Sequence, residues 1–262
     1  MPEFPADAFV GTARAYVRYR PAYPASMLDD LRQRAGITGR GVLLDLGCGP
    51  GRVAIPLAPH FRHVWAVDPE PEMIEAGRGE AARVGARNIE WKVGRAEEVE
   101  AAAGSVELVT FGESFHRVDQ PLVLAHAREW LRPGRCLATM GANSIFQSEA
   151  PWHAVVCDTM RKWTGGWAGP KTRAEARKFW THDATILAGG FSDVTSHEFL
   201  VPHVWQVDEI VGYMDATSGA SRRRLGANAD ACHADLKRAL LEWDSRGEYA
   251  DTLWFAYTLA RL

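Results

Sequence analysis

The chain has 262 residues, 47% of them hydrophobic, and a formal net charge of −3. This length suits a single α/β domain with insertions, although two compact domains are also possible, and the apolar fraction is ample for a core. The negative net charge argues against nucleic acid as the main partner, because phosphate binding needs clustered basic surface.

Cysteine spacing and the absence of long apolar runs narrow the class of protein further. Cys48, Cys136, Cys157 and Cys232 form no C-x-x-C pair, which predicts reduced thiols instead of a zinc site or a disulfide scaffold. The first residues lack a signal-peptide pattern, and no apolar run approaches the roughly 18 residues of a membrane span. We therefore expect a cytoplasmic protein with no metal site and no membrane partner. The oligomeric state cannot be inferred from these features.

Strands and helices alternate through the first half of the chain. A helix over 12–21 ended by Pro21 and a second helix over 27–35 come first. The expected strands then cover 42–46, 64–67, 89–93, 106–111 and 136–140, and the helical segments between them begin near 52, 72, 97 and 121. Such βα units predict a doubly wound parallel sheet with right-handed crossovers. Ligands of these sheets bind beyond the carboxyl ends of the strands, beside the first one.

The segment 143–180 interrupts this alternation. It places Trp152, Trp163, Trp167 and Trp180 among glycines, which is aromatic surface on a flexible backbone. That composition predicts a substrate lid, although packing is the more common role of tryptophan. Beyond it the sequence predicts helices over 183–187, 207–216 and 230–243, a strand over 194–199 and a closing β-rich run over 252–260.

The stretch 42–52, VLLDLGCGPGR, is the most informative part of the chain. Its first half predicts a strand buried on both faces, and Gly47, Gly49 and Gly51 predict a turn that approaches a ligand closely. A turn that leads into a helix is expected to present free backbone N–H groups. A dinucleotide fingerprint, G-x-G-x-x-G, would need glycine where Arg52 stands.

At this motif the chain resembles the class I S-adenosylmethionine-dependent methyltransferases, and within them small-molecule, type 11-like members. The resemblance implies one domain with a Rossmann-like, seven-stranded, mostly parallel sheet whose last strand enters antiparallel between strands five and six. Its parts would be N-terminal cap helices over 1–35, a cofactor-binding core over 42–141, a lid over 143–180 and the rest of the sheet over 181–262.

The resemblance also implies where S-adenosyl-L-methionine would bind. In the family the turn holds the methionine part, and an acid closing the second strand takes the ribose hydroxyls; Asp68 stands about 20 residues after the turn, as expected of that acid. The N-terminal segment covers the cofactor there, although its helix could equally pack on the sheet with Arg20 in solvent. Arg95 stands where relatives place an acid or a small residue, so its backbone or a stacked guanidinium would serve. The implied cofactor residues are Tyr16, Arg20, Asp45, Gly47, Cys48, Gly49, Gly51, Asp68, Pro69, Met73, Arg95, Ala96 and Gly112.

The end of the fourth strand is expected to face the transferred methyl group. Glu113 and Arg117 stand where relatives often have glutamine and tryptophan, which suggests a polar or cationic acceptor. His116 is a candidate general base, since an unperturbed imidazole has a pKa near 6.5, and Glu113 could be its carboxylate partner or the base itself. His116 could instead only orient this loop. Arg117, Trp152 and Trp167 are the candidate acceptor-binding residues.

The leading hypothesis is therefore a methyltransferase that moves a methyl group to an oxygen or nitrogen of a small molecule, as in secondary metabolism. Two alternatives come from other classes. A regulatory or scaffold protein could have kept the cofactor pocket and lost the transfer activity. A nicotinamide-dependent oxidoreductase is disfavoured by Arg52.

Overall fold

The computed structural model describes residues 7–143, 145–165, 174–175 and 181–262, which divide between two compact units. One unit, here called the sheet unit, comprises 22–142, 180–199 and 255–262. The other, the helical unit, comprises 1–21, 143–179 and 200–254. Whether they act as the single domain expected from the sequence stays a prediction. No helix in the described ranges is long and apolar enough to cross a membrane.

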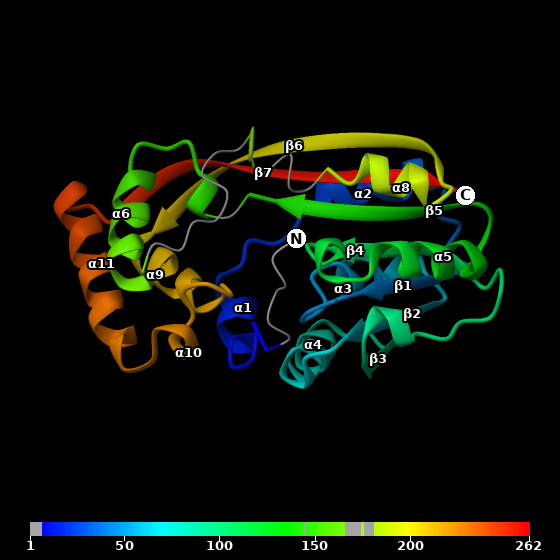
Figure 1. The fold of residues 1–262 in the computed structure, drawn as a ribbon, viewed down its shortest axis with the longest axis horizontal. Coiled ribbons are helices and arrows are strands. Elements are labelled where there is room, and N and C mark those ends of the chain that lie inside the picture. Colours follow the sequence, from blue (N-terminus) through cyan, green and yellow to red (C-terminus); the bar gives the residue numbers. More distant parts are fainter. Residues whose placement is uncertain (1–6, 144, 166–173, 176–180) are drawn as a thin grey trace. The chain divides into compact units, whose positions relative to one another are not determined.

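A seven-stranded sheet forms the framework, with the strand order β3-β2-β1-β4-β5-β7-β6 (Figure 1). Its strands are β1 (Val42–Leu46), β2 (His63–Asp68), β3 (Ile89–Val93), β4 (Val106–Gly112), β5 (Leu131–Ala142), β6 (Ser192–Gln206) and β7 (Glu248–Arg261). The first five strands pair in parallel, and β7 lies antiparallel to β5. This arrangement confirms the predicted doubly wound sheet, including the last strand between the fifth and the sixth.

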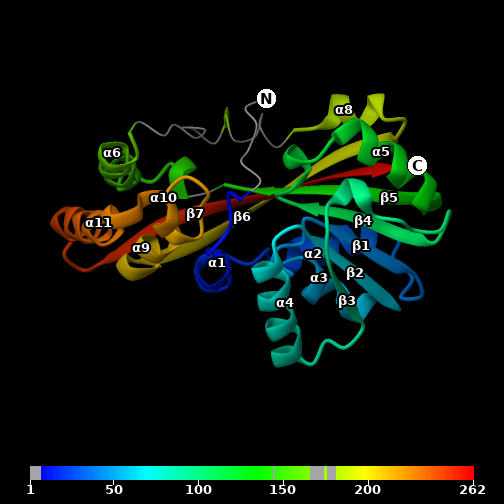
Figure 2. The same ribbon diagram turned by 60° about the horizontal axis from the view of Figure 1, so that its bottom comes forward.

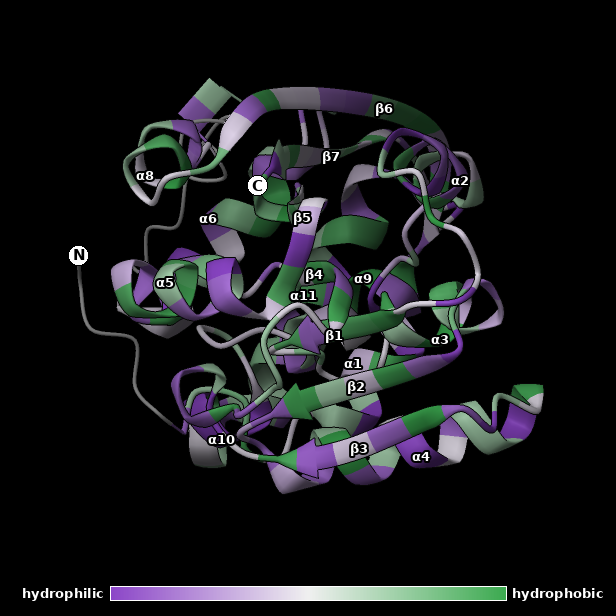
Figure 3. Cartoon of the chain, turned by 90° about the vertical axis from the view of Figure 1, so that its right-hand side faces the viewer, coloured by the Kyte–Doolittle hydropathy of each residue, from purple (hydrophilic) through white to green (hydrophobic). Residues whose placement is uncertain are grey.

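Helices cover both faces of the sheet in the sheet unit. They are α2 (Ala25–Arg34), α3 (Ala54–Leu57), α4 (Pro71–Val84), α5 (Gln120–Trp130) and α8 (Asp183–Ala188), with the 3-10 turns η1 (Ala58–His60), η2 (Ala96–Glu98) and η3 (Phe115–Arg117). Figure 2 shows α5 and α8 on one side of the sheet and α3 and α4 on the other. Every residue of β1 is buried, as expected for a central strand. The outermost strand β3 carries hydrophilic stretches that the middle of β2 lacks (Figure 3).

The helical unit is built around the long helix α11. Its elements are α1 (Ala13–Tyr19), η4 (Ile145–Gln147), α6 (His153–Thr164), α9 (Val207–Asp215), α10 (Arg222–Leu225), η5 (Gly226–Asn228) and α11 (Ala229–Trp243). Helix α11 packs against α6 and α9, and α1 packs against α9. The contact between α1 and α9 requires Gly212, because a Cβ there would lie 2.3 Å from the Tyr19 ring.

Several elements differ from the sequence-based expectation, among them the following three. Helix α6 lies inside the segment expected to be a lid, where Val156 and Met160 are buried four residues apart. Helix α3 begins at Ala54 and not near 52. Strand β6 runs to Gln206, beyond the expected end at 199. The sequence-based expectation for 143–180 relied on its tryptophans and glycines and overlooked the helical spacing of its apolar residues.

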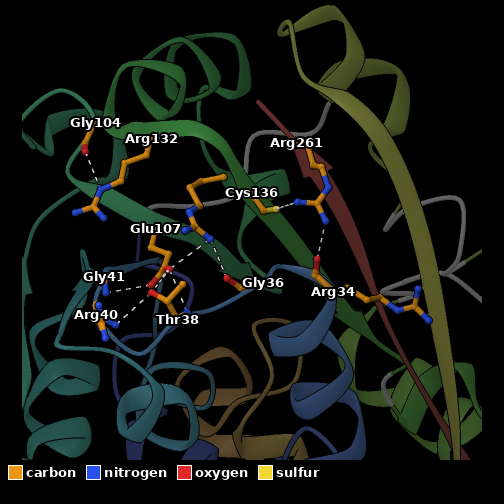
Figure 4. Close-up of polar contacts among 11 residues, drawn as sticks. Arg34, Gly36, Thr38, Arg40, Gly41, Gly104, Glu107, Arg132, Cys136 and Arg261 are labelled. Atoms are coloured by element: carbon orange, nitrogen blue, oxygen red, sulfur yellow. Dashed lines mark hydrogen bonds and ion pairs between the residues drawn. The ribbon is translucent and has the colours of Figure 1, made fainter.

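The edge where the parallel strands begin, here called the amino edge, contains a fully buried carboxylate (Figure 4). Glu107 accepts hydrogen bonds from the Thr38 N–H at 3.2 Å, the Thr38 hydroxyl at 2.8 Å and the Gly41 N–H at 3.1 Å. The Arg135 guanidinium lies 3.4 Å from it and donates to the Gly36 carbonyl at 2.8 Å. Glu107 thus fastens the loop after α2 to the start of β4, since a buried charge is stable only when paired and hydrogen-bonded.

Candidate functional site

The glycine turn follows β1 and is tied to the end of β2. Gly47, Gly49 and Gly51 have φ values of 65°, 53° and 86°, which glycine adopts without strain. The N–H groups of Gly47 and Cys48 donate to the Val67 carbonyl at 2.8 and 3.0 Å. A Cβ at Gly47 would lie 2.4 Å from the Ser114 Cβ, whereas a Cβ at Gly49 would meet no atom within 4 Å. Gly49 therefore faces open space in front of the strand.

The expectation of free N–H groups in this turn is wrong for the positions described above. Besides Gly47 and Cys48, Gly49 donates to the Asp68 carboxylate at 2.8 Å and Gly51 donates to the Cys48 carbonyl at 3.0 Å. The turn offers close approach to its backbone, not unpaired donors. This follows from its need to satisfy its own buried backbone groups.

Asp45 supports the turn from behind. Its carboxylate is fully buried and accepts hydrogen bonds from the Thr110 hydroxyl at 2.8 Å and the Ala54 N–H at 3.1 Å. Burial raises the pKa of Asp45 to about 7, and the two hydrogen bonds oppose this rise. The carboxylate joins β1, β4 and α3 and does not face solvent, so any effect of Asp45 on a cofactor passes through the turn.

Asp68 and the turn are in direct contact. The Asp68 carboxylate accepts the Gly49 N–H through one oxygen and the Glu70 N–H, at 2.9 Å, through the other. Burial raises the pKa of Asp68, opposed by the bonds from Glu70 and Gly49 and by the charge of Arg117. Each oxygen has a further lone pair, so the carboxylate can still accept hydroxyl donors. The turn and the acid that closes the second strand are thus brought together.

The residues expected around the adenine follow β2 and β3. Pro69 is exposed, and Met73 on α4 is buried. Arg95 is exposed and pairs with Glu97 at 3.2 Å, while Ala96 is buried at the start of η2. The Gly94 N–H donates to the Asp68 carbonyl at 3.1 Å, which places this loop beside the end of β2.

An ion pair that the sequence reasoning missed joins the turn to the end of β4. Arg52 lies 2.8 Å from the Glu113 carboxylate, and their side chains are 14% and 10% exposed. The Arg52 guanidinium also lies over the Tyr23 ring, 4.6 Å from its centroid. Glu113 has a φ of 57°, uncommon for a residue with a side chain, and follows Gly112, where a Cβ would lie 2.9 Å from Val53.

Ser114 adds a second link, because its hydroxyl donates to the Leu46 carbonyl at 2.6 Å. The opposite charges of Arg52 and Glu113 are the signal that could have revealed their pair. The two residues are 61 positions apart, and only the pairing of β1 with β4 brings them together.

His116 does not have the near-normal pKa expected of a general base. Burial, with smaller effects from the charges of Arg117 and His182, lowers its pKa to about 3. His116 is therefore neutral at ordinary pH, and its imidazolium would be a strong acid. Phe115, in the same loop as His116, packs edge-on against His182, which precedes α8, with a centroid distance of 4.9 Å. The role of His116 in a reaction stays a prediction.

Arg20 and Tyr16 contact each other within the helical unit. The Arg20 guanidinium lies over the Tyr16 ring at 5.1 Å and donates to the Tyr213 hydroxyl at 2.8 Å and the Ala216 carbonyl at 3.3 Å. Their expected contact with the cofactor stays a prediction.

Trp152 is 1% exposed and its indole N–H donates to the Ala250 carbonyl at 2.9 Å. It also packs against Tyr249 with a centroid distance of 5.7 Å, which favours the packing interpretation for this residue. Trp167 lies outside the described residues. Among the residues that are described, no group of three or more metal-ligating side chains is found.

Sequence comparison places this site in a methyltransferase domain. Residues 43–134 match the family model described as a methyltransferase domain. A protein of Dictyostelium discoideum that is provisionally named a methyltransferase is 22% identical over 90% of this chain and 86% of its own length. An uncharacterized methyltransferase of Mycobacterium tuberculosis is 33% identical, and the match spans 48% of this chain and about half, 49%, of that relative.

Solved structures share the fold. A protein of Anaeromyxobacter dehalogenans, provisionally described as a type II methyltransferase, has a TM-score of 0.67 and 24% identity over 93% of this chain and 98% of that one. Phosphoethanolamine N-methyltransferase 2 of Haemonchus contortus, in complex with phosphomonomethylethanolamine and S-adenosylhomocysteine, has a TM-score of 0.53 and 15% identity over 95% of this chain and 56% of that one. At these identities the likeness concerns the fold.

Proposed function

We propose that this chain is a class I S-adenosylmethionine-dependent methyltransferase, which binds this cofactor and transfers its methyl group to an oxygen or nitrogen of a small molecule. The contact between Asp68 and the Gly49 N–H carries the proposal. It places a carboxylate beside a backbone position where a Cβ would meet no atom, so the residues present fit a ribose with an adjoining amino-acid part.

Each element of the site has a proposed task. Asp68 accepts the ribose hydroxyls, and the turn from Gly47 to Gly51 lies beneath the methionine part. Pro69, Met73, Arg95 and Ala96 surround the adenine. When bound, the cofactor supplies a methyl group activated by the sulfonium. Gly112 and the Glu113 loop shape the space for the acceptor, and Arg52 holds that loop by its ion pair.

Two observations support a small-molecule acceptor. The net charge of −3 disfavours a polyanionic substrate. The Haemonchus enzyme with a similar fold is described in complex with a small phosphorylated amine. Glu113 is already paired with Arg52, so its negative charge does not by itself favour a cationic acceptor. A cytoplasmic location remains an expectation.

Calorimetry with S-adenosylmethionine, S-adenosylhomocysteine and NAD tests the cofactor assignment. Asp68→Ala removes a charged acceptor and should weaken binding of the first two by about 1.5 to 3 kcal/mol. Glu98→Gln, a charge change at an exposed residue of η2, is the control and should leave binding unchanged. Binding of NAD without S-adenosylmethionine would show that the chain is instead a nicotinamide-dependent protein.

Product formation separates the enzyme from a regulatory or scaffold protein. Candidate hydroxylated and amino metabolites would be incubated with the protein and cofactor and examined by mass spectrometry for the gain of one methyl group. Tight cofactor binding with no methylated product from any acceptor and no S-adenosylhomocysteine release would favour the scaffold alternative.

A further inference from the structure

The amino edge of the sheet is strongly basic although the whole chain is not. The segments at this edge are 35–41, 58–62, 85–88 and 101–105, which precede β1, β2, β3 and β4, and 132–135 at the start of β5. They contain Arg40, Arg62, Arg87, Arg132 and Arg135 but neither aspartate nor glutamate. The net charge of −3 therefore conceals an uneven distribution.

Strand order converts these arginines into a row. Arg87, Arg62 and Arg40 precede β3, β2 and β1, which are neighbours in the sheet, and Arg132 belongs to β5 further along. Neighbouring strands lie about 4.8 Å apart, so the segments of Arg87, Arg62 and Arg40 follow one another at about this interval, whereas that of Arg132 lies two strands, about 10 Å, further along. Figure 4 shows Arg40 and Arg132 on two of them.

Backbone contacts hold the segments of the row in fixed positions. The Arg62 N–H donates to the Gly41 carbonyl at 3.0 Å, and the Val64 N–H donates to the Asn88 carbonyl at 2.9 Å. The Asn88 side chain donates to the carbonyls of Ala58 and Phe61, both at 2.9 Å. The segments that carry the row are thus part of the sheet framework.

Two acids near the row, Glu107 and Glu90, have other partners. Glu107 is held by Thr38, Gly41 and Arg135, as described above. Glu90 pairs with His63 at 3.1 Å and with Lys92 at 3.1 Å. Within the described part of the chain, Arg40, Arg62, Arg87 and Arg132 have no ion pair with a carboxylate. Their charges remain available to an external anion.

Arg135 and Arg261 have a structural task and do not belong to the row. Arg135 donates to the Gly36 carbonyl, and Arg261 donates to the Arg34 carbonyl at 2.6 Å, so both cap the end of α2. Arg132 donates through its Nε to the Gly104 carbonyl at 3.1 Å. Arg40, Arg62 and Arg87 are exposed, and no contact of their side chains within the described residues explains them.

We propose that the row of Arg40, Arg62, Arg87 and Arg132 is a docking surface for a single strand of nucleic acid, held through its phosphates. A guanidinium group can donate two parallel hydrogen bonds to one phosphate. A line of such cations matches a linear polyanion. A bilayer surface would also need apolar anchors. Among the exposed large apolar side chains of the described residues, Val84 alone adjoins these segments. This inference does not depend on the proposed methyl transfer.

Fluorescence anisotropy with a labelled 20-nucleotide uridine RNA tests the proposal, with polyglutamate and vesicles containing phosphatidylserine as other anions. The RNA should bind with a dissociation constant of about 1 to 100 µM, and log K should fall with log salt with a slope of about −2 to −3. Failure to bind the RNA at low salt would overturn the proposal. Stronger binding of polyglutamate or vesicles than of RNA would overturn the assignment to nucleic acid.

A matched pair of triple variants localises the binding. The test variant carries Arg40→Gln, Arg62→Gln and Arg87→Gln, and the control carries Arg14→Gln, Arg18→Gln and Arg224→Gln, three exposed arginines of the helical unit, so that both lose the same net charge. The test variant should bind the RNA at least tenfold more weakly, with a salt slope reduced by about 2, whereas the control should change affinity less than threefold. Equal losses in both variants would show a general charge effect and contradict the proposed surface.

Discussion

The two edges of the central sheet use charge in different ways. At the carboxyl edge, acids and arginines are paired with the backbone or with each other: Asp68 with Gly49 and Glu70, and Arg52 with Glu113. At the amino edge, one buried acid, Glu107, secures the loops while exposed arginines face outward. The carboxyl edge thus pairs its charges around the glycine turn, and the amino edge leaves arginine charges exposed.

One fold thus separates two electrostatic tasks. Parallel strands end at one edge and begin at the other, so residues after the strands never mix with residues before them. Mutations at either edge can therefore be compared while the framework between them stays the same.

The largest effect is expected from a glycine pair with nearly equal backbone geometry. Gly47 at the carboxyl edge and Gly104 at the amino edge have φ values of 65° and 62°, but only at Gly47 would a Cβ overlap a neighbour. Gly47→Ala should lower the free energy of unfolding by roughly 3 to 5 kcal/mol, through backbone strain and overlap with Ser114. Gly104→Ala should cost about 1 to 2 kcal/mol from strain alone.

Urea unfolding of the two alanine variants measures this difference. The comparison of the edges would fail if both substitutions cost the same, because the turn would then have room for a side chain. Cofactor should be absent from these experiments, since binding would add to the stability of the wild type.

A smaller effect is expected from two acids at opposite edges, the buried Glu107 and the partly buried Glu113. Glu107→Gln should cost roughly 2 to 4 kcal/mol of stability, because the amide cannot accept all the hydrogen bonds of the carboxylate and Arg135 loses its counter-charge. The affinity of the Glu107→Gln variant for S-adenosylmethionine should stay within about twofold of the wild type, since the contacts of Glu107 are to the loops at the amino edge. Glu113→Gln should destabilise the protein and also weaken cofactor binding, because Arg52 follows the turn.

Chemical unfolding and calorimetry on both glutamine variants provide the readout. An equal loss of cofactor affinity in Glu107→Gln would mean that the two edges are coupled. Unchanged affinity in Glu113→Gln would remove the ion pair from the list of features that shape the pocket.

The smallest effect, taken per pH unit, concerns His116 at the carboxyl edge. The unfolded chain binds a proton at His116 below about pH 6.5, whereas burial lowers the pKa in the folded state to about 3. The unfolded state is thus favoured as pH falls from about 6.5 towards 3, and stability from this residue is lost by up to about 1.4 kcal/mol per pH unit. His116→Gln should reduce this pH dependence.

Urea unfolding at pH 7, 6, 5 and 4.5 tests the effect against His63→Gln, a histidine on the other edge that is half exposed. The free energy of wild type minus that of His116→Gln should decrease steadily as the pH falls. A constant difference over this range would contradict the lowered pKa.

Local patterns in the sequence predicted much of the fold and part of the site. The glycines of the turn and Asp68 follow from short motifs, because the backbone demands of the turn are expressed within a few residues. The ion pair of Arg52 with Glu113 could not be predicted in this way, since it depends on the pairing of β1 with β4. Glu107 was likewise predicted only to lie in a strand, because no local sequence pattern indicates that it contacts Thr38, Gly41 and Arg135.

Two predictions about the site were wrong for the same physical reason. The expected free N–H groups of the turn and the expected near-normal pKa of His116 both assumed solvent around these groups. In the folded protein the turn is bonded to Val67 and Asp68, and His116 is partly buried beside Arg117. The burial of a residue depends on all the elements that pack around it, so it is hard to predict from one sequence.

The links between β1 and β4 also set the order in which the site can form during synthesis. The pairs Asp45 with Thr110, Leu46 with Ser114, and Arg52 with Glu113 are separated by 65, 68 and 61 residues. A ribosome adds about 5 to 20 residues per second, so the glycine turn waits roughly 3 to 14 s for the strand that completes it. The glycine turn is therefore synthesised early, but its links to β4 can form only after the segment carrying Ser114 has emerged.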